Sequence, residues 1–198
     1  MGLMAKDSGG GYDPVEAGVY HGICYAVVDL GTQFSTVYNT ESRKVLIMWE
    51  LPTERIKVKG DDLPRAINRI FTLSLNKKAN LRSFLECWRG KEFTEAELKG
   101  FDMKNLIGVN CQLNIIHSNR NGKTYADVAS AMPLLKGTEK RALENAPLYF
   151  SFDDNMELPE HCPDWVAERV QKSAESTGRT GPELGPHDQT KAEDDVPF

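Results

Sequence analysis

Basic and aromatic side chains are interleaved along the middle of this 198-residue sequence. Arg43 and Lys44 lead into Trp49, and Arg69 lies two residues before Phe71. Unpaired nucleic acid is bound by cations that contact its phosphates and by aromatic faces on which its bases stack, each stack contributing about 1–3 kcal/mol. The spacing therefore predicts a groove that binds single-stranded nucleic acid with little sequence preference.

The predicted contact residues gather where positive charge is concentrated. Residues 43–91 hold twelve basic and five acidic side chains, although the whole chain has a net charge of −5. The candidates for contact with DNA are Tyr25, Tyr38, Arg43, Lys44, Trp49, Arg55, Lys57, Lys59, Arg65, Arg69, Phe71, Lys77, Lys78 and Tyr125. The alternative for any one cation is a solvated surface charge, and for any aromatic it is packing in the core. Core packing is expected for Phe34, Phe84, Phe93, Phe101, Phe150 and Phe152.

Catalytic and metal-binding patterns are missing from the sequence. It has no Gly-rich phosphate loop, Ser-centred elbow or His-Glu-x-x-His motif. The histidines are far apart, at His21, His117, His161 and His187. The cysteines form no Cys-x-x-Cys pair, which argues against zinc and structural disulfides; they are Cys24, Cys87, Cys111 and Cys162. We therefore expect no enzyme activity, no metal site and no cofactor.

The order of β-prone and helical runs predicts a mainly β fold. Three strand-like runs come first, then a helix with one apolar face that ends at Gly90. A short helix over 95–99 follows, opened by a capping box of Thr94 and Glu97, and then a hairpin around the Asn121-Gly122 turn. A short β-prone run and a C-terminal helix follow. In order, the runs are 15–30, 45–51, 66–74, 77–88, 106–117, 124–132, 149–152 and 163–174. This is the element order of an OB-fold, a five-stranded Greek-key barrel with a helix between strands three and four, although a different small β-barrel gives much the same order.

Composition divides the chain into three parts. Residues 1–14 form a Gly-rich flexible arm, and residues 15–173 are enough for one OB-fold domain that binds single-stranded nucleic acid. Residues 174–198 hold six acidic side chains and little apolar surface, so we expect a disordered acidic tail. The tail closes on Asp194-Asp195-Val196-Pro197-Phe198, whose carboxylates and aromatic ring suit docking into a basic pocket of a partner protein.

Two resemblances bear on function. The run 194–198 resembles the acidic tip of bacterial single-stranded-DNA-binding proteins, which in that family recruits replication and repair enzymes. The body does not resemble those proteins, but its segments 24–33, 49–52 and 85–90 resemble tailed-phage proteins of single-stranded-DNA binding or replication. The resemblances imply a phage protein of DNA replication, recombination or repair that recruits host or phage replication proteins. They place it in the cytoplasm of the host bacterial cell, and no apolar run approaches the roughly 20 residues that span a bilayer.

Other readings stay open. A recombination annealase or mediator would pair complementary strands, and an adaptor without nucleic-acid function would have its aromatics buried or in a protein interface. Double-stranded DNA and RNA also stay open as ligands because phosphate contacts discriminate poorly. We expect a monomer or a homodimer. The groove requires rings and cations to line one trough. Burial of Trp49, with Arg43, Lys57 and Arg69 scattered over the molecule, would contradict it.

Overall fold

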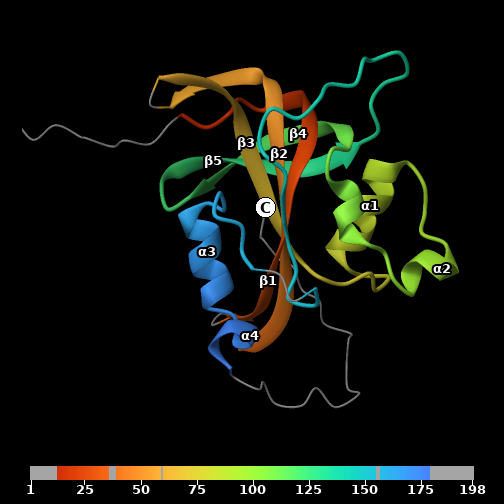
Figure 1. Cartoon of the computed structure of the whole chain (residues 1–198). Helices are drawn as coiled ribbons and strands as arrows, with labels where there is room; N and C mark the ends of the chain where they lie inside the picture. Colours follow the sequence, from red (N-terminus) through yellow and green to blue (C-terminus); the bar gives the residue numbers. More distant parts are fainter. Residues whose placement is uncertain (1–12, 36–38, 59, 155–156, 179–198) are drawn as a thin grey trace, which may run out of the picture.

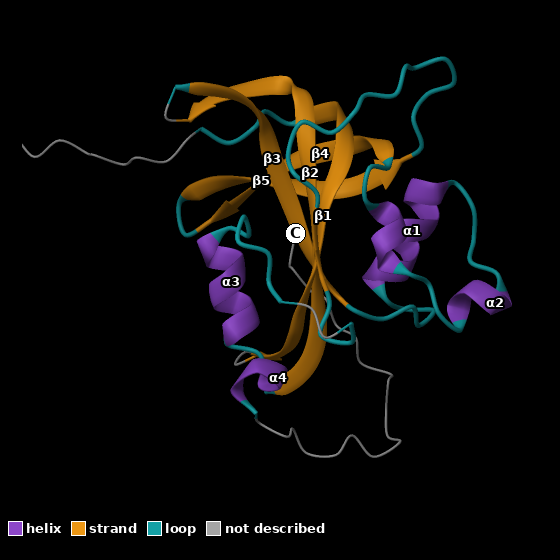
Figure 2. Ribbon diagram, viewed as in Figure 1, coloured by secondary structure: helices purple, strands orange, loops and turns teal. Residues whose placement is uncertain are grey.

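The structure of the protein is a computed structural model that describes residues 13–35, 39–58, 60–154 and 157–178. Its strands are β1 (Gly18–Ser35), β2 (Thr40–Val58), β3 (Asp61–Thr72), β4 (Asn110–Arg120), β5 (Lys123–Met132) and β6 (Leu148–Phe150). Its helices are α1 (Asn80–Arg89), α2 (Glu95–Leu98), the 3-10 helix η1 (Met103–Leu106), α3 (Asp164–Gln171) and α4 (Ala174–Thr177). In Figures 1 and 2, α1 and α2 lie on one side of β1 and β2, with α3 and α4 on the other.

Among the described residues, five strands form one strongly curled antiparallel sheet. Its order is β3-β2-β1-β4-β5, and β6 adds to β1 in parallel beyond the stretch that pairs with β4. The curl depends on β1, whose first residues pair with β4 and whose later residues pair with β2. The β1–β2 register shifts at Cys24–Ala26 and at Asp29–Gly31, and such bulges bend a strand. The predicted mainly β, OB-like fold is confirmed at this level.

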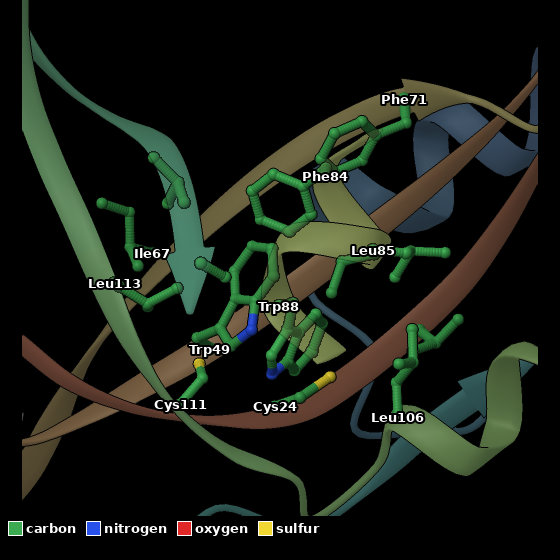
Figure 3. Close-up of a cluster of buried hydrophobic side chains, with 14 of the residues drawn as sticks. Cys24, Trp49, Ile67, Phe71, Phe84, Leu85, Trp88, Leu106, Cys111 and Leu113 are labelled. Carbon is green, nitrogen blue, oxygen red and sulfur yellow. The ribbon is translucent and has the colours of Figure 1, made fainter. Parts of the chain in front are cut away.

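The inner face of the curled sheet holds the main core. Side chains alternate along a strand, so Val45, Ile47 and Trp49 of β2 all point to this face, where α1 covers them. The helix presents one apolar stripe, made of Leu81, Phe84, Leu85 and Trp88. The ring of Trp49 lies 5.8 Å from that of Phe84 and 5.6 Å from that of Trp88, centroid to centroid, as Figure 3 shows. Full burial of each such side chain contributes about 1.5–3 kcal/mol.

The outer face of β1 and β2 is also buried, because the chain after β5 returns to cover it. Leu46 and Met48 of β2 pack there with β6 and α3. The carboxylate of Glu50, fully buried on this strand, fastens the returning chain. It accepts hydrogen bonds from the backbone N–H groups of Glu144 (2.9 Å) and Asn145 (2.8 Å), and from Asn145 Nδ2 (2.7 Å). These three donors replace the hydrogen bonds to water that the Glu50 carboxylate loses on burial.

Some element boundaries differ from those predicted. β2 does not stop at Pro52 but runs to Val58, because Pro52 falls in a gap in the β2–β3 ladder, between Leu51 and Arg55, where no ladder N–H is needed. α1 begins at Asn80 rather than Lys77, since its N-cap is Ala79 and no side chain caps it.

The helix signals that depend on local chemistry are confirmed. Gly90 ends α1 in the left-handed conformation, with φ of 67°. The capping box formed by Thr94 and Glu97 opens α2. Both features act within a few residues, which is why the sequence alone predicts them.

The predicted tail starts with structure rather than disorder. Residues 174–177 form α4, opened by the Ser173 side chain, which accepts a hydrogen bond from the Ser176 N–H. The Glu175 carboxylate fastens α4 to β1, because it accepts hydrogen bonds from Thr32 N and Thr32 Oγ1. Residues 1–12 of the predicted arm, Tyr38, Lys59 and residues 179–198, including the predicted docking run, lie outside the described residues.

In the described part of the chain, no helix combines the length and apolar character that crossing a membrane requires.

Candidate nucleic-acid interface

The prediction that aromatic rings line an open trough is wrong for three residues. Trp49 and Phe71 lie in the main core under α1, and Tyr25 lies in the outer core, where its hydroxyl donates to Met48 Sδ at 3.6 Å. Burial raises the pKa of the Tyr25 hydroxyl well above its ordinary value. None of these rings presents a face to solvent. Both faces of β1 and β2 are covered, which buries Tyr25 and Trp49, and Phe71 of β3 packs against Phe84 of α1. Alternation along β2 places Trp49 on the same face as Val45 and Ile47, but it does not say which face of the strand is buried.

The cations at the start of β2 are held by neighbours in the fold. Arg43 forms an ion pair with the buried Asp29 and a second one, at 2.9 Å, with Asp153. Hydrogen bonds to Asp29 and, secondarily, to Asp153 raise the pKa of the Arg43 guanidinium. Lys44 Nζ donates to Thr72 Oγ1 at 2.7 Å. These two cations join the strands β1, β2 and β3, and their positions are explained by the fold alone.

Arg69 fastens the sheet where it comes closest to closing. Its Nη1 donates to the backbone carbonyls of Val128 (2.8 Å) and Ala129 (2.9 Å) on β5. Its guanidinium lies over the ring of Phe84, 5.4 Å from the centroid. β3 and β5 have no strand ladder between them in the described residues, so this side chain supplies hydrogen bonds across the seam.

The far end of the β2–β3 hairpin holds mixed charges. Arg55 pairs with Asp62 at 3.0 Å and with Glu144 at 2.8 Å, and Arg65 donates to the carbonyl of Asp13. Lys57 is exposed on β2. Arg43 stands near the opposite end of the same strand, so Arg43, Lys57 and Arg69 do not line one trough. The shared trough predicted from the sequence is therefore wrong.

Tyr125 is the predicted stacking residue that stays accessible among those described. It lies on the β4–β5 hairpin, 42% exposed, with the Arg120 guanidinium 5.5 Å from its ring centroid. Lys123 begins β5 beside it and is exposed. The turn is the predicted Asn121-Gly122 pair, and both residues have positive φ, 50° and 74°, as a tight hairpin turn requires. Arg120 also pairs with Asp127 at 2.5 Å. A ring, an exposed lysine and a paired arginine thus meet on one hairpin.

A pocket opens where α1, β3 and β5 meet; we call it the α1 pocket. It encloses about 290 Å³ and is lined by Arg69, Asn80, Ser83, Phe84, Cys87, Ala129 and Ser130. The predicted cations Lys77 and Lys78 are exposed just before α1. Sequence reasoning missed Asn80, Ser83 and Ser130, as well as Arg120 and Lys123. Serine and asparagine are too common on surfaces to signal a site without their neighbours in space.

A second pocket, here called the acidic pocket, is lined by Asp29 of β1 and Arg43 of β2 among others. It encloses about 430 Å³. Its carboxylates are Asp29, Asp102, Asp153 and Asp154, and its apolar wall includes Val27, Leu73, Leu98, Phe101 and Phe150. Tyr149 donates from its hydroxyl to Asp154 at 3.0 Å. Asp153 and Asp154 belong to the stretch 144–168, which holds seven acidic residues and no Lys or Arg.

One further aromatic departs from expectation. Phe34, assigned to the core from the sequence, is 55% exposed on β1, opposite Glu41 of β2. It stands near the β1–β2 connection, away from the β4–β5 hairpin, with an acidic neighbour. It is therefore a suitable control for Tyr125.

Comparison with models of known protein families found no match, and no curated protein matched the sequence.

Proposed function

We propose that this protein binds single-stranded DNA with little sequence preference in phage DNA replication or recombination. One observation carries the proposal: an OB-like curled sheet whose β4–β5 hairpin exposes Tyr125 beside Arg120 and Lys123. OB-folds bind oligonucleotides through strands two and three and through the loops that flank them, the loop between strands four and five included. Here that hairpin combines one stacking surface with the exposed Lys123 and with Arg120, which also pairs with Asp127. Unpaired bases and phosphates need such rings and cations.

The interface differs from the one predicted because stacking moves from β2 to the β4–β5 hairpin. The remaining phosphate contacts would come from the exposed lysines Lys57, Lys77 and Lys78. We propose in addition that the sheet is a full Greek-key OB barrel, closed between β3 and β5 with Arg69 as the bridge. The run 194–198 is proposed to dock replication proteins.

The test is a titration of the whole chain with oligo(dT), a DNA duplex and oligo(rU) at several salt concentrations. We expect the tightest binding to oligo(dT), weakening as salt rises because phosphate contacts release counterions. The Tyr125→Ala variant should bind oligo(dT) about five- to 150-fold more weakly, since one stacked base contributes roughly 1–3 kcal/mol. Phe34→Ala is the matched control and should bind like the parent protein. Equal losses in both variants, or no binding by the parent protein, would overturn the proposal.

A second candidate is an adaptor without nucleic-acid function. The observation in its favour is the burial of Trp49, Phe71 and Tyr25, which removes most of the predicted stacking surface. The same titration separates the two candidates, because an adaptor shows no affinity for any of the three nucleic acids.

A further inference from the structure

The α1 pocket has the chemistry of an anion site. The Arg69 guanidinium is held flat near Phe84, and its position is fixed by hydrogen bonds to two β5 carbonyls. Hydroxyl and amide groups complete the wall, from Ser83, Ser130 and Asn80. A guanidinium beside neutral donors is the combination that proteins use for phosphate oxygens.

The charge around this pocket points the same way. No carboxylate is found among the described residues that line it, and the exposed Lys77 and Lys78 directly precede the helix that forms one wall. The acidic pocket, by contrast, brings four carboxylates together. A polyanion close to this molecule is attracted to the first pocket and repelled by the second.

The α1 pocket and the proposed stacking hairpin share the strand β5. Tyr125 lies near the start of that strand and Ser130, in the pocket wall, lies five residues later. At about 3.4 Å per residue in an antiparallel strand, the two are roughly 17 Å apart along β5. A DNA strand with one base on Tyr125 therefore reaches the pocket with phosphates a few nucleotides away.

We propose that the α1 pocket is a subsite for the phosphodiester backbone of single-stranded DNA that runs along β5 from Tyr125. This inference rests on the proposed function and adds the direction of the strand and a contact surface on α1. It assigns Ser83, Asn80 and Ser130 as phosphate-contacting residues.

Cys87 makes the proposal directly measurable. It lines the α1 pocket and is exposed, whereas Cys24, Cys111 and Cys162 are buried. Burial raises the pKa of each of those three thiols, and alkylation needs the thiolate. Iodoacetamide therefore modifies the folded protein at Cys87 first.

The first experiment measures the rate of Cys87 alkylation with and without saturating oligo(dT). We expect bound oligo(dT) to slow the reaction about tenfold or more, while a DNA-free sample with the same salt shows no change. Binding without protection of Cys87 would overturn the subsite and leave the proposed function standing. Absence of oligo(dT) binding would overturn both.

The second experiment compares two adducts of the same thiol. Iodoacetate leaves a carboxylate on Cys87 and iodoacetamide leaves a neutral amide of nearly the same size. We expect the carboxylate adduct to bind oligo(dT) at least about five-fold more weakly than the amide adduct at low salt, with a smaller gap at high salt. The Cys87→Ser variant, treated with either reagent, should bind alike. Equal affinity of the two adducts would overturn the proposal.

Discussion

The α1 pocket and the acidic pocket are built on the same curled sheet but are opposite in charge. In the α1 pocket, Arg69 stands among serine and asparagine side chains. In the acidic pocket, Arg43 is paired with Asp29 and Asp153, and further carboxylates lie around it. Both arginines come from the basic stretch 43–91. The difference is that carboxylates neutralise Arg43, whereas the described residues that line the α1 pocket include no carboxylate beside Arg69.

Asp29→Ala should have the largest effect on stability, because it removes a buried carboxylate that lines the acidic pocket. Asp29 is buried and accepts hydrogen bonds from Gly31 N (2.9 Å) and Phe152 N (3.3 Å) as well as pairing with Arg43. Its removal leaves a half-buried guanidinium short of its main partner, and we expect a loss of about 3 kcal/mol in the free energy of unfolding. Urea denaturation measures it.

The control for that variant is Asp154→Ala, which removes an exposed carboxylate from the same pocket. We expect a change within about 1 kcal/mol. Similar losses in both variants would mean that Asp29 has no special structural role.

Glu50→Gln should have the next largest effect and should separate the two pockets. Glu50 fastens residues 144–145, and the chain after them forms one wall of the acidic pocket. Because an amide offers one acceptor oxygen where a carboxylate offers two, we expect a loss of about 2 kcal/mol. Hydrogen exchange at the Glu144 and Asn145 amides should accelerate while the alkylation rate of Cys87 stays constant. A faster Cys87 reaction would show that the pockets are not independent.

A pair of double variants tests the comparison by charge. Lys77 and Lys78 flank the α1 pocket, whereas Lys99 and Lys104 stand beside residues of the acidic pocket. Replacing Lys77 and Lys78 by Gln should weaken oligo(dT) binding about five-fold at low salt and lower the salt slope by roughly 1.4, the value for two lost phosphate contacts. The Lys99→Gln, Lys104→Gln variant should leave both quantities unchanged. Equal affinities and salt slopes of the two double variants would mean that DNA does not prefer the α1 pocket to the acidic pocket.

The smallest expected effect concerns α4, whose Glu175 lies beside Gly31 of β1. Partial burial opposes ionisation of Glu175, but hydrogen bonds from Thr32 bring the pKa of its carboxyl below the ordinary value. Its stabilising contribution is therefore present above about pH 4.3, the unfolded value, and is lost as the pH falls through the lower folded value. We expect Glu175→Gln to cost less than about 1 kcal/mol at pH 7 and progressively less as the pH is lowered toward 3, as measured by urea denaturation. A loss of equal size at both pH values would contradict this.

Local signals predicted much of the fold. The apolar stripe of α1, its end at Gly90, the Thr94 capping box and the Asn121-Gly122 turn depend on neighbours within a few residues, and the structure has them all. The order of strands then follows from short connections.

The site depended on contacts that span the chain. Glu50 and Asn145 are ninety-five residues apart, and their bond belongs to the returning segment that buries the outer face of β2. The sequence alternation could not show that both faces of this strand would be covered. It therefore did not decide whether Trp49 is buried or exposed. Tyr125 is exposed near the Asn121-Gly122 turn, which the sequence does predict.

The most direct test of the central claim is the affinity for oligo(dT) of two serine variants, one in each pocket. Ser83→Glu adds a carboxylate to the α1 pocket, and Ser151→Glu adds one to the acidic pocket. Measured by fluorescence anisotropy at about 50 and 200 mM salt, Ser83→Glu should weaken binding about tenfold at the lower salt, while Ser151→Glu should match the parent protein. Equal affinities of the two variants would contradict the account.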